Sequence, residues 1–269
     1  MAEGGEKAFA FAQELDRRLE TGGKLWLFLD YDGTLKEFAP TPAHINPDPA
    51  IAERLKRLVK RPNLRISVIS GRRLSHVREL IPIKGIIMAG TYGIELDIPE
   101  QGRHHPVAWE DIRPVLDELK PRWEELLQGR EGFFLEDKGW ALAIHGRRAD
   151  PEEADLVLDR AEAILEERQP LDEFRVLGGY KFLEIGPKMA NKGDTIEYLL
   201  EKFPLQDAQL VYIGDDDKDE EAFAVIQKHG GKAIVVSKEP RRTLADYRLE
   251  NPAGVHRWLE TLAPDGGVE

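Results

Sequence analysis

The chain has 269 residues, of which 41% are hydrophobic and 33% charged, a composition typical of a globular protein with one large domain or two modest ones. Its formal net charge of −12 disfavours nucleic acid and anionic membrane surfaces as partners, so an anionic substrate would need a local positive cluster or a metal ion. The absence of cysteine excludes disulfides, thiolate catalysis and cysteine-based zinc sites.

Short apolar runs alternate with helical patterns at both ends of the chain. The predicted strands are residues 25–29, 64–69, 86–89, 210–213 and 233–236. Their nearly continuous apolar character is typical of strands that are covered on both faces. Between the first two, Asp48 as N-cap and Pro49 as first helical residue predict a helix. Strands that alternate with helices predict a parallel sheet with helices on both sides.

The middle of the chain has a different pattern, in which short strands occur in pairs around helices. In chain order, these segments are a helix over 107–128, strands at 132–139 and 140–148, a helix that begins at Asp150 and Pro151, and strands at 174–179 and 180–186. We therefore predict an α/β protein, with a Rossmann-like parallel-sheet core formed by residues 1–105 and 188–269. An α+β domain over residues 106–187 is inserted into this core.

Four polar clusters follow predicted core strands or begin a helix. They are Asp30-Tyr31-Asp32-Gly33-Thr34, Ser70-Gly71-Arg72, Asn191-Lys192-Gly193 and Gly214-Asp215-Asp216-Asp217-Lys218-Asp219. Each alone has a common structural explanation: a turn, an ordinary strand-to-helix connection, a surface lysine or an acidic helix start. Together they predict one ligand-binding edge at the carboxyl ends of the strands. The carboxylates would repel one another there unless a cation neutralised them, and oxygen ligands of this kind favour magnesium.

Magnesium at a carboxylate edge indicates phosphoryl chemistry. One carboxylate can attack phosphorus, and a second one two residues later can protonate the leaving alcohol and then activate water. The lysine and the hydroxyl groups would hold the phosphoryl oxygens. No Walker-type phosphate loop and no glycine-rich dinucleotide motif follows the first strand.

In order, the motifs D-x-D-G-T, S-G-R, N-K-G and G-D-D-x-x-D resemble those of the haloacid dehalogenase-like phosphatase superfamily. The resemblance implies that Asp30 is the nucleophile and Asp32 the general acid/base, with Lys192 as the phosphate-clamping lysine. It places the phosphate at Thr34, Ser70, Gly71, Arg72 and Lys192. It also implies a magnesium site made by Asp30, the backbone carbonyl of Asp32, and Asp215, supported by Asp216 and Asp219.

Within this superfamily the chain is most similar to the trehalose-6-phosphate phosphatase family. The similarity includes the segments "LEDKGWALAIHGR" and "FLEIGPKMANKGDTIEYLL". It implies that the inserted domain is a cap whose sugar-contacting residues are Glu136, Lys138, His145, Arg147 and Glu184. The chain departs from the family pattern at Tyr92, at Tyr180-Lys181 and at Gly186. Because these departures include positions on or near the recognition strands, the sugar stays open.

The resemblance implies hydrolysis of trehalose 6-phosphate to trehalose and phosphate, through an aspartyl-phosphate, in trehalose biosynthesis. Glucosyl- or mannosyl-3-phosphoglycerate and sucrose 6-phosphate are alternative substrates, and a phosphomutase or a catalytically silent binding module are alternative functions. We expect a cytoplasmic protein with a small sugar phosphate as its partner, since no signal-peptide pattern and no apolar run of roughly 20 residues occurs. We expect a monomer, with an oligomer left open.

Overall fold

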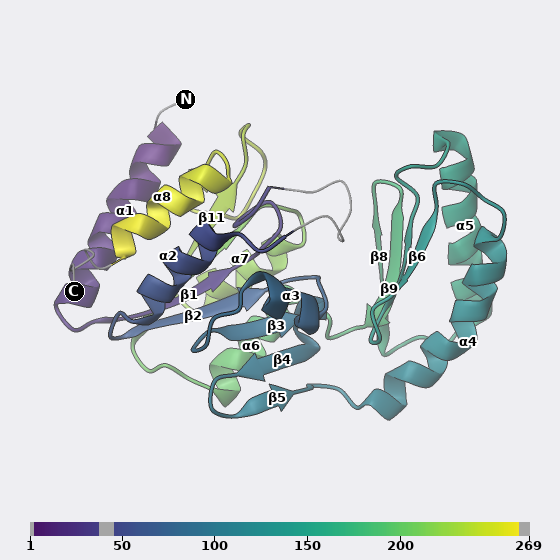
Figure 1. The fold of residues 1–269 in the computed structure, drawn as a ribbon, viewed down its shortest axis with the longest axis horizontal. Coiled ribbons are helices and arrows are strands. Elements are labelled where there is room, and N and C mark those ends of the chain that lie inside the picture. Colours follow the sequence, from purple (N-terminus) through teal and green to yellow (C-terminus); the bar gives the residue numbers. More distant parts are fainter. Residues whose placement is uncertain (1–2, 38–45, 264–269) are drawn as a thin grey trace. The chain divides into compact units, whose positions relative to one another are not determined.

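The computed structural model describes residues 3–37 and 46–263 (Figure 1). The chain divides into two compact units, one formed by residues 1–104 and 191–269 and the other by residues 105–190. The second unit is thus an insertion within the first. Each unit has a sheet of its own.

The larger unit is built on an eight-stranded sheet with the order β12-β11-β10-β1-β2-β3-β4-β5. Its strands are β1 (Lys24–Leu29), β2 (Leu64–Ile69), β3 (Ile87–Gly90), β4 (Glu95–Ile98), β5 (Gly102–His104), β10 (Ala208–Gly214), β11 (Lys232–Val236) and β12 (Tyr247–Leu249). All neighbouring strands from β12 to β3 are parallel. The α/β class and the parallel core sheet predicted from the sequence are confirmed.

Helices cover both faces of this sheet. They are α1 (Glu3–Glu20), α2 (Pro49–Val59), α3 (Leu74–Leu80), α6 (Lys192–Lys202), α7 (Asp219–Lys228) and α8 (Pro252–Leu262). Alternate residues of β1 point to opposite faces, as the pleat of a strand requires. Leu25, Leu27 and Leu29 pack in the cluster with α1, α2, α3 and α8, whereas Trp26 and Phe28 pack with α6 and α7. The strand is therefore apolar at every position from Leu25 to Leu29.

The strand order reverses direction at β1, and this brings two distant motifs together. From β1 the chain proceeds outward through β2 and β3, but β10 pairs with the other side of β1. Leu29 lies opposite Ile213, and the N–H of Asp30 donates to the carbonyl of Ile213 at 2.9 Å. Residues that follow β1 and β10 consequently share one edge. In open α/β sheets such a switch point is where ligands bind.

Two antiparallel strands, β4 and β5, extend the sheet beyond β3. The sequence pattern did not predict them, because they have only four and three residues and contain charged side chains. The short 3₁₀ turn η2 (Thr91–Gly93) reverses the chain between β3 and β4. The sheet is therefore mixed at this edge and parallel elsewhere.

The predicted helix starts at Asp48 and Asp150 are confirmed. The carboxylate of Asp48 accepts from the N–H of Ala50 and precedes Pro49 at the start of α2. The terminal helices α1 and α8 pack on the core, and the indole N–H of Trp258 donates to the carbonyl of Ala8 at 2.8 Å. Among the described residues, no helix is both long and apolar enough to cross a bilayer.

The smaller unit is a four-stranded antiparallel sheet with two helices along one face (Figure 1). Its elements are α4 (Trp109–Leu127), β6 (Phe134–Asp137), β7 (Leu142–His145), α5 (Pro151–Glu167), β8 (Phe174–Gly179) and β9 (Phe182–Pro187), in the sheet order β6-β7-β9-β8. Trp123 of α4 is fully buried, and its indole N–H donates to the carbonyl of Ala161 in α5. Asp137 joins the sheet to α4 through a two-pronged ion pair with Arg113, at 2.8 Å for each oxygen.

Candidate active site

Asp30 and Lys192 form a buried ion pair at the carboxyl edge of the core sheet. Asp30 follows the central strand β1, and Lys192 is the first residue of α6. The Nζ of Lys192 lies 2.8 Å from Oδ1 of Asp30, and the two residues are 4% and 5% exposed. The side chain of Asn191 caps α6 and accepts from the N–H groups of Gly193 and Asp194. The helix start therefore fixes the lysine opposite the carboxylate.

Asp219 is the hydrogen-bonding centre of this edge. Its fully buried carboxylate accepts from Lys192 Nζ at 2.5 Å, Tyr212 OH at 2.6 Å, and the N–H groups of Asp215 at 2.9 Å and Asp216 at 3.0 Å. Both oxygens are thus already used as acceptors. Sequence reasoning missed Tyr212. Its signal was a tyrosine within the apolar run of residues 210–213, where a buried hydroxyl normally needs a partner.

The loop after β1 packs tightly against the loop after β10. Gly33 has a φ of +79°, and a Cβ atom at this position would lie 2.1 Å from Oδ2 of Asp215. Only glycine suits both the left-handed backbone and this close approach. The hydroxyl of the fully buried Thr34 lies 3.4 Å from Oδ1 of Asp215. The structure therefore brings Asp30, Thr34, Lys192 and Asp215 to one place.

Crowded carboxylates at this edge perturb one another. Burial, followed by the charge of Asp219 and opposed by Lys192, raises the pKa of Asp30 to about 7. Burial, with the charges of Asp30 and Asp219, raises the pKa of Asp215 to about 9. Burial alone would lower the pKa of Lys192, but the carboxylates of Asp219 and Asp30 outweigh it and raise that pKa well above its usual value. The edge thus has more negative charge than Lys192 alone can balance.

This excess of negative charge suits a divalent cation. One carboxylate oxygen from each of Asp30, Asp215 and Asp219 lies within 4.8 Å of the others. Oxygen-only ligand sets are those that magnesium prefers. Because both oxygens of Asp219 already accept hydrogen bonds, Asp30 and Asp215 are the better direct ligands. The side chain of Asp216 turns instead to the N–H of Lys218, at 2.7 Å.

The second motif forms a bridge to the first. Arg72 holds Asp32 with a two-pronged ion pair, 2.7 Å from each carboxylate oxygen. Ser70 is 1% exposed, and its hydroxyl accepts from the N–H of Arg72 at 3.1 Å. In the structure Arg72 pairs with Asp32, and the phosphate contact that the family resemblance implies for Arg72 stays a prediction. His76, 3.2 Å from the same guanidinium, was not anticipated.

A second polar cluster lies in the smaller unit, on its own sheet. Glu136 and Glu184 both lie opposite Ala143 and so share one face. Lys138 donates to Glu184 at 2.5 Å, with 7% and 2% of these residues exposed, and His145 pairs with Glu136 at 2.9 Å. The helices contact the other face. Of the five residues expected here, Arg147 stands apart, exposed in the turn after β7.

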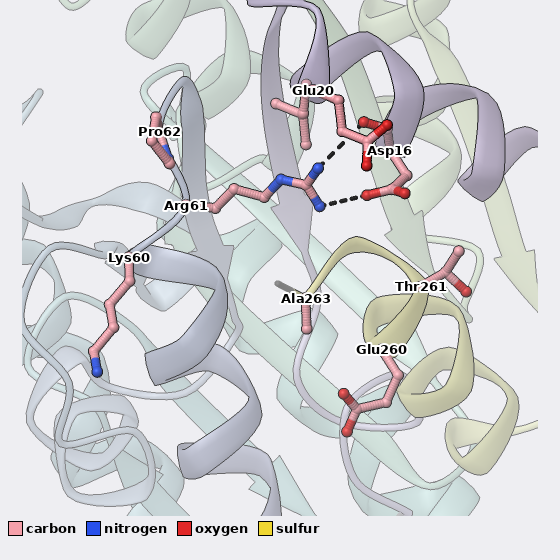
Figure 2. Close-up of a pocket in the computed structure, with 9 residues that line it drawn as sticks. Asp16, Glu20, Lys60, Arg61, Pro62, Glu260, Thr261 and Ala263 are labelled. Carbon is pink, nitrogen blue, oxygen red and sulfur yellow. Dashed lines mark hydrogen bonds and ion pairs between the residues drawn. The ribbon is translucent and has the colours of Figure 1, made fainter. Parts of the chain in front are cut away.

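A pocket of about 550 Å³ in the larger unit lies away from these motifs (Figure 2). Figure 2 shows Arg61, between α2 and β2, pointing at Asp16 of α1. Because Arg61 precedes the start of β2 and Ser70 follows its end, the pocket lies at the opposite edge of the sheet. Arg61 is paired with Asp16 and donates to the carbonyl of Leu262, which indicates a structural role in joining α1 to α8.

Comparisons with known proteins agree with this architecture. The trehalose-phosphatase family model matches residues 28–253. The structural match to the C-terminal domain of C. albicans trehalose-6-phosphate phosphatase covers 93% of this chain and 96% of that one, with a TM-score of 0.79 at 23% identity. Trehalose-6-phosphate phosphatase from Aspergillus fumigatus gives a TM-score of 0.65 at 24% identity, over 93% of this chain and 97% of that one. The family match, together with the fold, identifies the chain as a haloacid dehalogenase-like phosphatase, a phosphoric monoester hydrolase.

Relatives with similar sequences show to which phosphatase family the chain belongs. The chain is 32% identical to probable trehalose-phosphate phosphatase D of Arabidopsis thaliana, over 90% of this chain and 68% of the relative. It is 31% identical to trehalose 6-phosphate phosphatase RA3 of Zea mays, over 92% of this chain and 72% of the relative. This chain belongs to the trehalose-phosphatase family.

Proposed function

We propose that this protein is a magnesium-dependent phosphatase that hydrolyses trehalose 6-phosphate to trehalose and phosphate through an aspartyl-phosphate. The observation that supports this most is the buried Asp30–Lys192 pair beside Asp215, at the switch point of the sheet. Membership of the trehalose-phosphatase family supports the choice of substrate. We further propose that the protein acts in trehalose biosynthesis in the cytoplasm.

Asp30 is the nucleophile in this proposal. Its carboxylate oxygen forms a bond to phosphorus while the bond between phosphorus and the sugar oxygen breaks, and Asp32 gives a proton to that oxygen. Asp32 then takes a proton from water as the water oxygen attacks phosphorus, which releases phosphate and restores Asp30. Arg72 holds one lone pair on each oxygen of Asp32, and a carboxylate has further lone pairs through which it can meet the substrate.

The remaining motif residues hold the phosphoryl group. Thr34, Ser70 and the N–H of Gly71 supply neutral donors, and Lys192 supplies the positive charge that balances the phosphoryl oxygens. The carboxylates of Asp30 and Asp215, with the backbone carbonyl of Asp32, would hold magnesium. When bound, the ion neutralises charge on the phosphoryl oxygens and on the crowded carboxylates.

The smaller unit is the cap in this proposal, and its polar face recognises the sugar. Glu136, Lys138, His145 and Glu184 share acceptors and donors across one sheet face. Sugar hydroxyls need such fixed partners, because a buried polar group without one costs about 1–3 kcal/mol. We include Arg147 as a further sugar contact, although it lies outside the hydrogen-bonded cluster.

A substrate panel tests the proposal. With magnesium, we expect phosphate release from trehalose 6-phosphate to exceed that from p-nitrophenyl phosphate by at least ~100-fold in kcat/KM, since two or more sugar contacts each contribute about tenfold. The panel includes glucosyl- and mannosyl-3-phosphoglycerate and sucrose 6-phosphate. A preference for one of these would transfer the assignment to that sugar. No release from any phosphate ester would leave a binding module, and isomerisation without release would indicate a mutase.

A further inference from the structure

The turn between β3 and β4 has an unusual backbone. Thr91, Tyr92 and Gly93 follow one another with φ values of 48°, 54° and 100°. This left-handed region is uncommon for residues with a side chain and a clear outlier for a β-branched one such as Thr91. A costly conformation persists only where the surroundings enforce it, and such residues gather at functional sites. The turn therefore needs an explanation beyond a reversal of the chain.

Neighbouring groups enforce this turn from several sides. Thr91 donates its N–H to the carbonyl of Arg72 at 2.7 Å. Its hydroxyl and the N–H of Leu74 both donate to one oxygen of Glu95, at 3.0 and 3.1 Å. A Cβ atom on Gly93 would lie 1.7 Å from the hydroxyl oxygen of Thr195. The turn is thus fixed against the loop that follows β2 and against α6.

Tyr92 is bonded to three of the four motif regions. Its N–H donates to the carbonyl of Ser70 at 2.9 Å, and its carbonyl accepts from the hydroxyl of Thr195, three residues after Lys192 in α6, at 2.7 Å. Its phenol oxygen accepts from Nζ of Lys218 at 3.0 Å, and Lys218 lies in the loop after β10. The same ammonium lies 5.3 Å from the centre of the tyrosine ring.

The phenol ring of Tyr92 also packs closely against the Ser70–Gly71 loop. A Cβ atom on Gly71 would lie 2.6 Å from Cζ of Tyr92 and 2.7 Å from its hydroxyl oxygen. The ring of Tyr92 is therefore pressed against the backbone of Gly71. The hydroxyl of Tyr92 accepts from the ammonium of Lys218. The backbone N–H of Lys218 donates in turn to the carboxylate of Asp216 at 2.7 Å. Movement of Lys218 would release the ring, and movement of the ring would release Gly71.

We propose that Tyr92 and Lys218 are a pair of positioning residues, which together hold the Ser70–Gly71 loop in place to bind the phosphoryl group. The pair acts as one unit, because the ammonium orients the phenol and the phenol supports the loop. This inference rests on the proposed phosphatase function, in which Ser70 and Gly71 bind phosphate. Lys218 also adds a positive charge beside the acidic loop after β10, where the net charge of the site is negative.

The test measures affinity for inorganic phosphate by titration calorimetry with magnesium, together with its inhibition of p-nitrophenyl phosphate hydrolysis. Tyr92→Phe and Lys218→Met are each expected to weaken phosphate binding ~10-fold, the scale of one charge-assisted hydrogen bond. The double variant is expected to lose ~10-fold as well, because both changes break the same contact. Lys218→Arg is expected to restore part of the affinity. Lys228→Met, which removes the lysine at the end of α7 that pairs with Glu197, is the matched control and should bind phosphate normally.

Phosphate affinity that stays at the wild-type value in Lys218→Met and Tyr92→Phe would overturn the proposal. Losses that multiply to ~100-fold in the double variant would also overturn it, since the residues would then act independently. If Tyr92→Phe unfolds, the Met and Arg variants of Lys218 still decide the outcome. A wild-type protein that binds phosphate but releases none from any ester would refute the proposed function alone. A wild type that binds no phosphate would refute both.

Discussion

Replacement of Asp219 by asparagine should destabilise the larger unit strongly. The carboxylate accepts hydrogen bonds from Lys192, Tyr212 and two N–H groups of the loop after β10. An asparagine amide presents one oxygen and one NH₂ group, so one pair of these buried donors must face another donor. Loss of one partner of a buried ion pair costs about 3–5 kcal/mol. Relief of the repulsion with Asp30 and Asp215 offsets part of this cost.

Thermal unfolding at pH 7.5 in EDTA measures this effect. In a protein of this size about 1 kcal/mol shifts Tm by roughly 2–4 °C, so Asp219→Asn should lower Tm by about 10 °C. Asp217→Asn is the matched control, because this side chain lies in the same loop, is 96% exposed and pairs with Arg241 at the surface. Such a pair contributes about 0–1 kcal/mol. Equal Tm values for the two variants would refute the argument from buried hydrogen bonds.

Three further predictions concern charge, capping and the smaller unit. The carboxyl groups of Asp30 and Asp215 have raised pKa values in the folded protein, so they bind protons more tightly than in the unfolded chain. The metal-free protein should therefore lose stability as pH rises above about 4, until about pH 7 for Asp30 and about pH 9 for Asp215, and magnesium should oppose the loss. Chemical denaturation across this range tests the sign, and a metal-free stability that rises with pH would contradict it. Asn191→Ala should cost about 1 kcal/mol through loss of the α6 cap and slow phosphate release, as denaturation and initial rates would show. An unchanged midpoint would show that the cap is dispensable. Glu184→Gln should raise KM for trehalose 6-phosphate about tenfold through its contact with Lys138, but leave p-nitrophenyl phosphate unaffected, and a parallel loss on both substrates would argue against sugar recognition.

Local sequence signals predicted much of the fold. Asp48 and Asp150, each followed by proline, mark helix starts that the structure confirms, because capping is a matter of adjacent residues. The buried strands were recognisable because apolar residues occupy both faces. Strands β4 and β5 were missed because they are short and partly charged. Their pairing, β4 with β3 and β5 with β4, leaves no mark in the local sequence pattern.

The candidate site was predicted in its residues more fully than in its contacts. Asp30 and Asp215 follow two neighbouring parallel strands and lie at the same edge of the sheet, as the strand-end motifs predicted. The pair between Arg72 and Asp32 joins residues 40 positions apart and depends on how the loops after β1 and β2 meet. An arginine near several acceptors offers no local signal of its partner. The sequence also carried no sign of the central role of Asp219, because an acidic residue at a helix start is common on protein surfaces.

The most direct test of the account is phosphate release from trehalose 6-phosphate by the wild-type chain and by Asp30→Asn, measured with magnesium at equal folded concentration. The amide retains the size of the carboxylate but is no longer a nucleophile toward phosphorus. We predict rapid release by the wild type and no turnover above background by the folded variant. Release by Asp30→Asn at the wild-type rate would contradict the assignment of Asp30 as the nucleophile and the mechanism built on it.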